Sequence, residues 1–197
     1  MTANSDLAQT AAALIHARQT ILPKRLEAPG PDAVQLEQIL QAASAAPDHG
    51  QILPWRFVLV PREARARLAE AFAAALFERD AGATDAELGR ARDKAHRAPL
   101  LMLVLVDAQR GDPDVDLAER ILSAGCAVQN MLLMATALGF GSALTSGKAL
   151  KSQWLRKLFD LTEGEQALCF VNVGSVTLRR EARQRPATHD FLRTLDP

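Results

Sequence analysis

The spacing of apolar positions predicts two helices at the start of the chain. Over residues 6–17 such positions recur at steps of three and four, as on one face of a helix. Three prolines in residues 18–31 then favour an extended surface segment. Asp32 is expected to cap a second helix, with Gln35 three residues later, and Pro47 stops that helix near Ala46. The polar loop 47–54 that follows is expected to be functional.

The middle and the end of the chain alternate between strand and helix patterns. Residues 57–60 are typical of a strand, and a helix is expected from Pro61 to Phe77. A charged amphipathic helix follows over residues 84–97. The unbroken apolar run 100–106 predicts a strand that is buried on both faces, at the centre of a sheet. A last strand is expected over residues 167–173.

Residues 121–138 form a predicted helix that is apolar nearly all round. In a chain of 197 residues, such a helix favours an interface between two subunits. Gly139 and Gly141 are expected to end it, before a turn at residues 145–147 and a helix from about residue 151 to 159.

Composition narrows the function classes. The chain is 48% hydrophobic and balances 23 basic against 23 acidic residues without a long run of one sign, which argues against a nucleic-acid partner. Its length favours one domain over residues 1–197. The two cysteines, Cys126 and Cys169, lie in apolar surroundings and are expected to be buried, reduced thiols. The sequence has neither a signal peptide at its start nor an apolar run long enough to cross a membrane, so a cytoplasmic location is expected.

Several familiar motifs fail on spacing. Residues 141–148 suggest a phosphate loop, but five residues separate the glycines and Ala149 follows the lysine. The dinucleotide-binding pattern lacks its third glycine, since Leu144 stands there. The sequence has no Gly-x-Ser-x-Gly elbow, and its four histidines have no metal-ligand spacing, so no metal site is expected.

What remains are small polar and basic residues at the ends of predicted elements, a set that suits a phosphate-bearing cofactor. For each, a purely structural role stays open: Arg18 at the end of a helix, His49 in a turn, Arg183 and Arg185 in a solvated tail. Trp55 is interpreted as a core residue.

The order of these pieces along the chain resembles the flavin-dependent nitroreductase family, and within it a small bacterial branch. The likeness spans residues 14–185 and depends on Arg-Gln-Thr at 18–20, Ala-Pro-Asp-His at 46–49 leading to Pro-Trp-Arg-Phe at 54–57, Ser-Ala-Gly-Cys-Ala-Val at 123–128, Gly-Phe-Gly at 139–141 and Thr-Ser-Gly at 145–147. The resemblance implies an α+β fold with a central, mainly antiparallel sheet flanked by helices. It also implies an intertwined homodimer with two FMN molecules at the interface.

The resemblance also assigns cofactor-binding residues: Arg18, Gln19, Thr20, His49, Thr145, Ser146, Gly147 and Arg185. The first three and Arg185, with Arg183 as a further candidate, would hold the phosphate and ribityl chain. Residues 145–147 would lie along the isoalloxazine ring, and His49 would reach the flavin bound mainly by the other subunit. Two departures from the family concern the same site, since Gln19 replaces an arginine and Ala45 stands where some relatives carry one.

The implied activity is hydride transfer from NAD(P)H, through flavin N5, to an oxidised acceptor such as a nitroaromatic, a quinone or an activated alkene. Residues 135–140 correspond to a stretch associated with the nicotinamide donor. Because the cofactor performs the hydride transfer, no catalytic side chain is assigned. A flavin or small-ligand binding protein without turnover is the alternative. The sequence leaves open both the acceptor and the choice between NADH and NADPH.

Overall fold

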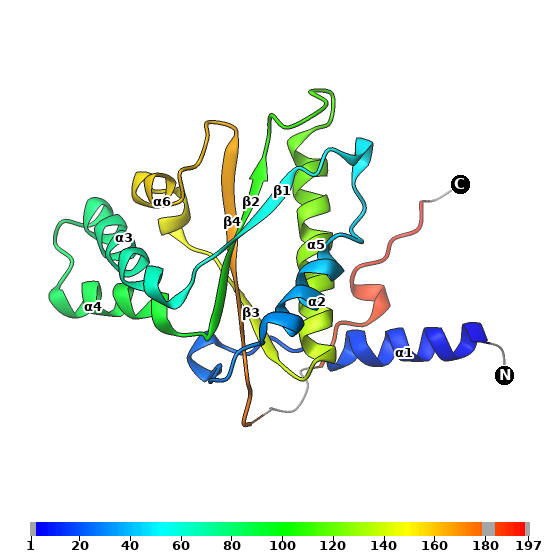
Figure 1. Ribbon diagram of the computed structural model, residues 1–197. Helices are drawn as coiled ribbons and strands as arrows, with labels where there is room; N and C mark the ends of the chain where they lie inside the picture. Colours follow the sequence, from blue (N-terminus) through cyan, green and yellow to red (C-terminus); the bar gives the residue numbers. More distant parts are fainter. Residues whose placement is uncertain (1–2, 179–183, 196–197) are drawn as a thin grey trace.

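A four-stranded sheet with helices on both faces forms the framework of the protein, as seen in the computed structural model (Figure 1). The structure describes residues 3–178 and 184–195. The strands are β1 (Trp55–Leu59), β2 (Leu100–Asp107), β3 (Gly141–Thr145) and β4 (Glu165–Gly174). The α-helices are α1 (Ala3–Ala17), α2 (Ala33–Ala43), α3 (Arg65–Arg79), α4 (Asp85–Asp93), α5 (Leu117–Ala137) and α6 (Gln153–Leu158). The short 3-10 turns named below are η4 (Lys94–His96) and η5 (Lys148–Lys151).

The strand order is β1-β2-β4-β3, and each neighbouring pair is antiparallel. This confirms the α+β fold with a mainly antiparallel sheet. It also confirms the apolar run as a central strand, because β2 lies between β1 and β4 and is buried from Leu100 to Val106. β1 and β3 are therefore the two edge strands.

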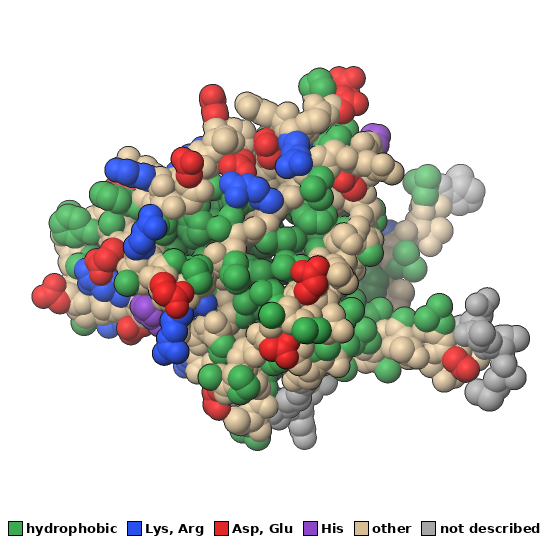
Figure 2. All heavy atoms as spheres, viewed as in Figure 1, with side chains coloured by type: hydrophobic (Ala, Val, Ile, Leu, Met, Phe, Trp, Pro, Cys, Tyr) green, Lys and Arg blue, Asp and Glu red, His purple; other side chains and the backbone are tan. Residues whose placement is uncertain are grey.

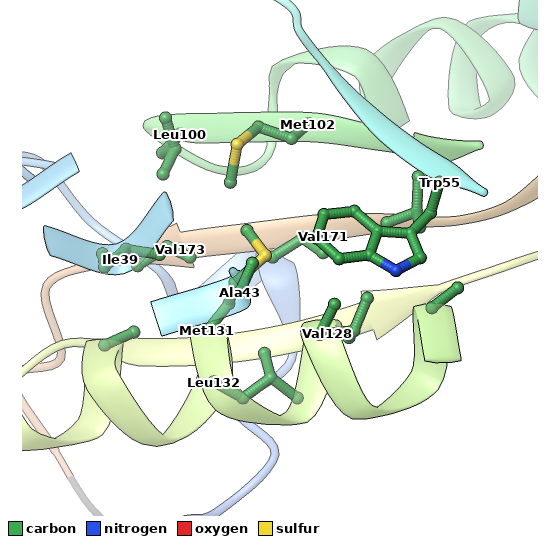
Figure 3. Packing of buried hydrophobic residues seen from close by; sticks show 14 of the residues in the cluster. Ile39, Ala43, Trp55, Leu100, Met102, Val128, Met131, Leu132, Val171 and Val173 are labelled. Atoms are coloured by element: carbon green, nitrogen blue, oxygen red, sulfur yellow. The ribbon is translucent and has the colours of Figure 1, made fainter. Parts of the chain in front are cut away.

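Successive residues of β2 alternate between two separate parts of the core. Met102 and Val104 pack in a cluster with residues of α2 and α5 (Figure 3). Trp55 of β1 belongs to the same cluster, which confirms it as a core residue. Leu103 and Leu105 pack on the opposite face, against α3 and α6. We call the helices on these two faces the α5 layer (α2 and α5) and the α3 layer (α3, α4 and α6).

Local sequence signals set several helix starts. Asp32 and Thr84 each form the expected capping box, in which the side chain accepts a hydrogen bond from the backbone N–H three residues later. The predicted helix 61–77 is observed as a 3-10 turn followed by α3, and the predicted helix 84–97 as α4 followed by η4. The expected helix 151–159 is shorter, because Ser152 caps α6 after the η5 turn.

Three expectations were wrong in detail. Residues 141–145 are a strand, and Thr145 ends it rather than lying in a turn, because pairing with β4 supplies order that the local pattern does not indicate. The segment 18–31 is not wholly at the surface, since Ile21 and Leu26 are buried against the end of the sheet. Cys126 and Cys169 are free but only half-buried.

α1 extends away from the rest of the molecule (Figure 1), and apolar side chains are visible along this projection (Figure 2). Leu7 and Ile15 of α1 are exposed. On α5, Leu122 is also exposed, with 68% of its surface accessible. No helix in the described residues is both long enough and apolar enough to span a bilayer.

Candidate cofactor site

The segment that carries Arg18, Gln19 and Thr20 is held at the start of β3. Thr20 forms a parallel bridge with Ser142, and the Ile21 N–H donates to the Ser142 carbonyl at 2.9 Å. Further along, the backbones of Glu27 and Ser175 exchange two hydrogen bonds of 2.9 Å each. The segment is therefore hydrogen-bonded to β3 at one end and to the residue that follows β4 at the other.

Two glycines make this close approach possible. Gly141 and Gly174 face each other in the β3–β4 ladder. A Cβ atom on Gly141 would lie 2.2 Å from Val176 Cγ2 and 3.0 Å from Ile21 Cγ1, and one on Gly174 would lie 3.1 Å from the Glu27 carbonyl oxygen. Side chains at these positions would push the segment off the sheet.

The tail of the chain returns to the same place. Arg185 Nη2 donates to the Arg18 carbonyl oxygen at 3.1 Å, which brings two predicted phosphate-binding residues together from opposite ends of the sequence. Within the described part of the chain, neither guanidinium pairs with a carboxylate. Arg183 lies outside the described residues. The local arrangement has the charge and the free donors that a phosphate group requires.

The predicted ring-binding segment, residues 145–147, lines a cavity of about 360 Å³ at the other end of β3. Pro23 also lines it, and this residue follows Thr20 by only three positions. Thr20 lies opposite Ser142, and Thr145 is three residues further along β3, which corresponds to about 10 Å. Thr20 and Thr145 therefore lie along the same strand, and the cavity is at the Thr145 end, where Pro23 belongs to its lining but Arg18, Gln19 and Thr20 do not.

Asn172 fixes the far end of this cavity. Its buried side chain donates to Thr145 Oγ1 at 3.0 Å and to the Ala143 carbonyl at 3.3 Å. Asn172 itself lines the cavity. The sequence analysis missed this residue, although a polar side chain inside the apolar run of β4 is a signal that could have found it.

Positive charge surrounds the cavity. Arg79, Lys94, Arg97 and Lys148 line it, and the described lining residues contain no Asp or Glu. These cations come from the end of α3, from the region of η4 and from the start of η5. Such a convergence depends on tertiary structure, so no local signal in the sequence indicates it.

His49 lies elsewhere in the subunit. Its Nδ1 is 2.7 Å from Glu119 Oε2 in the first turn of α5, and this hydrogen bond, with the negative charge of Glu119, raises the pKa of His49. Thr20 lies beyond the opposite end of α5, a helix about 30 Å long. His49 also precedes β1, whereas Thr145 ends β3, the other edge strand. One subunit therefore does not bring His49 to the cavity.

The remaining two predicted positions lie in or near the α5 layer. Within residues 135–140, Ala135 and Phe140 are buried in the core beside α5, and Gly139 adopts a left-handed backbone with a φ of 88°. Ala45 follows α2 and is exposed at the surface.

Comparison with known proteins places this fold and these segments in a family. Residues 15–175 match the family described as "Nitroreductase family". The chain belongs to the nitroreductase family. A Haemophilus influenzae protein named "Putative NAD(P)H nitroreductase" is 36% identical over 170 residues, which cover 86% of this chain and 91% of the relative. An Escherichia coli K12 protein named "Putative NAD(P)H nitroreductase YdjA" is 34% identical over 158 residues, which cover 79% of this chain and 83% of the relative.

Solved structures of nitroreductase-like proteins have the same fold. A nitroreductase-like family protein from Bacillus cereus superposes with a TM-score of 0.78 at 19% identity, covering 94% of this chain and 96% of the other. The NADPH:FMN oxidoreductase from Vibrio harveyi superposes with a TM-score of 0.71 at 21% identity, covering 94% and 77%. Membership of this family makes the protein an oxidoreductase.

Proposed function

We propose that the protein is an FMN-dependent oxidoreductase that passes a hydride from NAD(P)H, through flavin N5, to an oxidised acceptor such as a nitroaromatic, a quinone or an activated alkene. The observation that carries this proposal is the arrangement along β3, where Thr20 is bridged to Ser142 near the start of the strand and residues 145–147 line a cavity at its end. The names of the relatives, NAD(P)H nitroreductase and NADPH:FMN oxidoreductase, support the same chemistry.

The charges at the start of β3 suit the phosphate of FMN. Arg18 and Arg185 supply two guanidinium groups, and Thr20 supplies a hydroxyl group. Gln19 contributes amide donors but no charge, so Arg185 provides the second cation of the site in this proposal. Both guanidinium groups can form charge-assisted, two-point hydrogen bonds with phosphate oxygens.

The ring of FMN would lie along residues 145–147. Asn172 donates to the Thr145 hydroxyl group, and Ser146 and Gly147 line the cavity, where Gly147 has no side chain to occupy space. Bound FMN supplies the hydride-accepting and hydride-donating atom, so the protein needs no nucleophile of its own. The task of these residues is to bind and orient the ring and to limit what stacks on it.

The proposed protein is a cytoplasmic homodimer. Exposed apolar residues on α1 and α5, such as Ile15 and Leu122, favour burial against a second subunit. The distance of His49 from the cavity in its own subunit supports the expectation that it reaches the flavin of the partner. A second subunit would therefore complete the site rather than only stabilise it.

The test begins with the purified protein. We expect bound FMN with the absorption bands of oxidised flavin, and bleaching of those bands when NADH or NADPH is added without oxygen. Retained colour without bleaching would favour the non-catalytic flavin-binding protein, and a protein that takes up no FMN would contradict both. Replacing Arg18 with Gln should release FMN while leaving riboflavin binding nearly unchanged, because riboflavin lacks the phosphate.

A further inference from the structure

The charges that line the cavity differ in one respect from their neighbours. On α4, Arg92 pairs with Glu70 of α3 at 2.8 Å and Arg90 lies 3.9 Å from Glu87. Lys94 and Arg97, which follow directly along the chain and line the cavity, form no ion pair within the described residues. Within the described residues, Lys94 and Arg97 therefore lack the carboxylate partners that Arg90 and Arg92 have.

A phosphate on the cofactor would not neutralise them. In the proposed function, that phosphate lies near Arg18 and Arg185, about 10 Å along β3 from residues 145–147. Arg79, Lys94 and Arg97 belong instead to the wall formed by the α3 layer, and Lys148 adjoins the ring-binding segment. Even after the cofactor binds, this end of the cavity keeps an excess of positive charge.

We propose that this cationic wall binds an anionic group on the second ligand, a carboxylate or a phosphate carried by the acceptor or by the nicotinamide donor. Three features support it: four cations from three separate segments converge there, the described lining has no acidic residue, and the cavity adjoins the proposed ring site. Converging charges of one sign attract ligands of the opposite sign and speed their entry. The inference deepens the proposed function and depends on it.

The experiment compares ligands that differ only in charge. With FMN-loaded enzyme, kcat/KM is measured for 4-nitrobenzoate and for neutral 4-nitrobenzamide, and separately with NADPH and NADH, at low and high ionic strength. We expect the more anionic member of at least one pair to react about tenfold faster at low salt, with the advantage falling as salt rises. Lys94→Gln and Arg97→Gln should each reduce that advantage about threefold. Arg90→Gln, at an exposed cation of α4 that does not line the cavity, is the matched control and should leave the advantage unchanged.

The two arms identify the source of the anion. A change confined to the nitrobenzoate pair assigns it to the acceptor, and a change confined to the NADPH pair assigns it to the donor. Equal rates within both pairs, unaffected by the substitutions, would overturn the inference. It would also be overturned if Lys94→Gln weakened binding of FMN but not of riboflavin, because the lysine would then serve the cofactor's own phosphate. Failure of the proposed function is distinguishable, since it appears as absent FMN or absent bleaching in the unmodified protein.

Discussion

Replacing Gly141 with Ala tests whether the close contact at the start of β3 builds the phosphate end of the site. The added Cβ would lie 2.2 Å from Val176 Cγ2, 3.0 Å from Ile21 Cγ1 and 3.1 Å from Leu26 Cδ2. All three neighbours must move, and overpacking of this kind costs about 1–3 kcal/mol. For a chain of this size that corresponds to a decrease in Tm of about 3–10 °C.

The same substitution should weaken cofactor binding. Ile21 follows Thr20 directly, and its N–H bonds to Ser142, so a displaced Ile21 carries the Arg18–Thr20 segment away from β3. If one phosphate contact is lost, we expect FMN to bind about tenfold more weakly, equivalent to about 1.4 kcal/mol. Thermal unfolding with and without FMN, together with fluorescence titration of FMN, measures both effects.

Gly89→Ala is the control for this experiment. Gly89 lies within α4, and an added Cβ would meet no heavy atom within 4 Å. Alanine there should stabilise the helix by about 0.5–1 kcal/mol and leave FMN binding unchanged. If Gly141→Ala matches the unmodified protein in both Tm and FMN affinity, then the glycine is not what allows the segment to approach the sheet.

Three other predictions concern groups outside the cavity. Replacing the buried Arg120 with Met should destabilise the fold by about 3–5 kcal/mol in urea unfolding, because four backbone carbonyls between β2 and α5 lose their donor. Replacing Glu119 with Gln should lower the pKa of His49 in an NMR titration, since Glu119 raises it above the ordinary 6.5. The contribution of that pair to stability is present below about pH 6.5 and is lost as the pH rises through the higher pKa of the folded state. In a Cys126→Ser background, Cys169 should react far more slowly with a disulfide reagent than it does after unfolding, because burial raises the pKa of its thiol to about 11.

Each of these three predictions would be contradicted by a specific result. Arg62→Met, at an exposed site, should change the free energy of unfolding by less than about 0.5 kcal/mol. If Arg120→Met changes it by no more than Arg62→Met does, then the hydrogen bonds of Arg120 contribute little to stability. An unchanged pKa of His49 would mean that the hydrogen bond to Glu119 is not maintained in solution. Equal thiol reactivity in the folded and unfolded protein would place Cys169 in an accessible position.

The parts of the fold that the sequence predicted have strong local causes. The apolar run of β2 leaves little alternative to a central strand, and the capping residues Asp32 and Thr84 fix where helices begin. β3 was missed because its Gly-Ser-Ala-Leu-Thr sequence has no clear alternation and becomes a strand only by pairing with β4. Local pattern predicts an element well when the element's stability is itself local.

The candidate site, like the fold, was predictable only where short sequence motifs mark its residues. Arg18, Gln19, Thr20 and residues 145–147 were proposed from the order of motifs along the chain and stay predictions, while the structure brings Arg185 to Arg18. The cationic wall was not found, because Arg79 and Arg97 lie far apart in the sequence and only the folded chain brings them to one cavity with residues 145–147. Side chains that gather from separate helices leave no periodic trace in the sequence.

The sheet separates the molecule into two mechanically distinct halves. Leu103 and Met102 are neighbours in β2 but belong to different clusters, so a disturbance on one face meets a continuous layer of paired backbone before it reaches the other. The cavity is lined by residues of α3, such as Phe72 and Leu76, whereas the exposed apolar residue Leu122 belongs to α5 on the other face of the sheet. A protein built in this way can alter which molecules enter one half during evolution while keeping the surface on the other half intact.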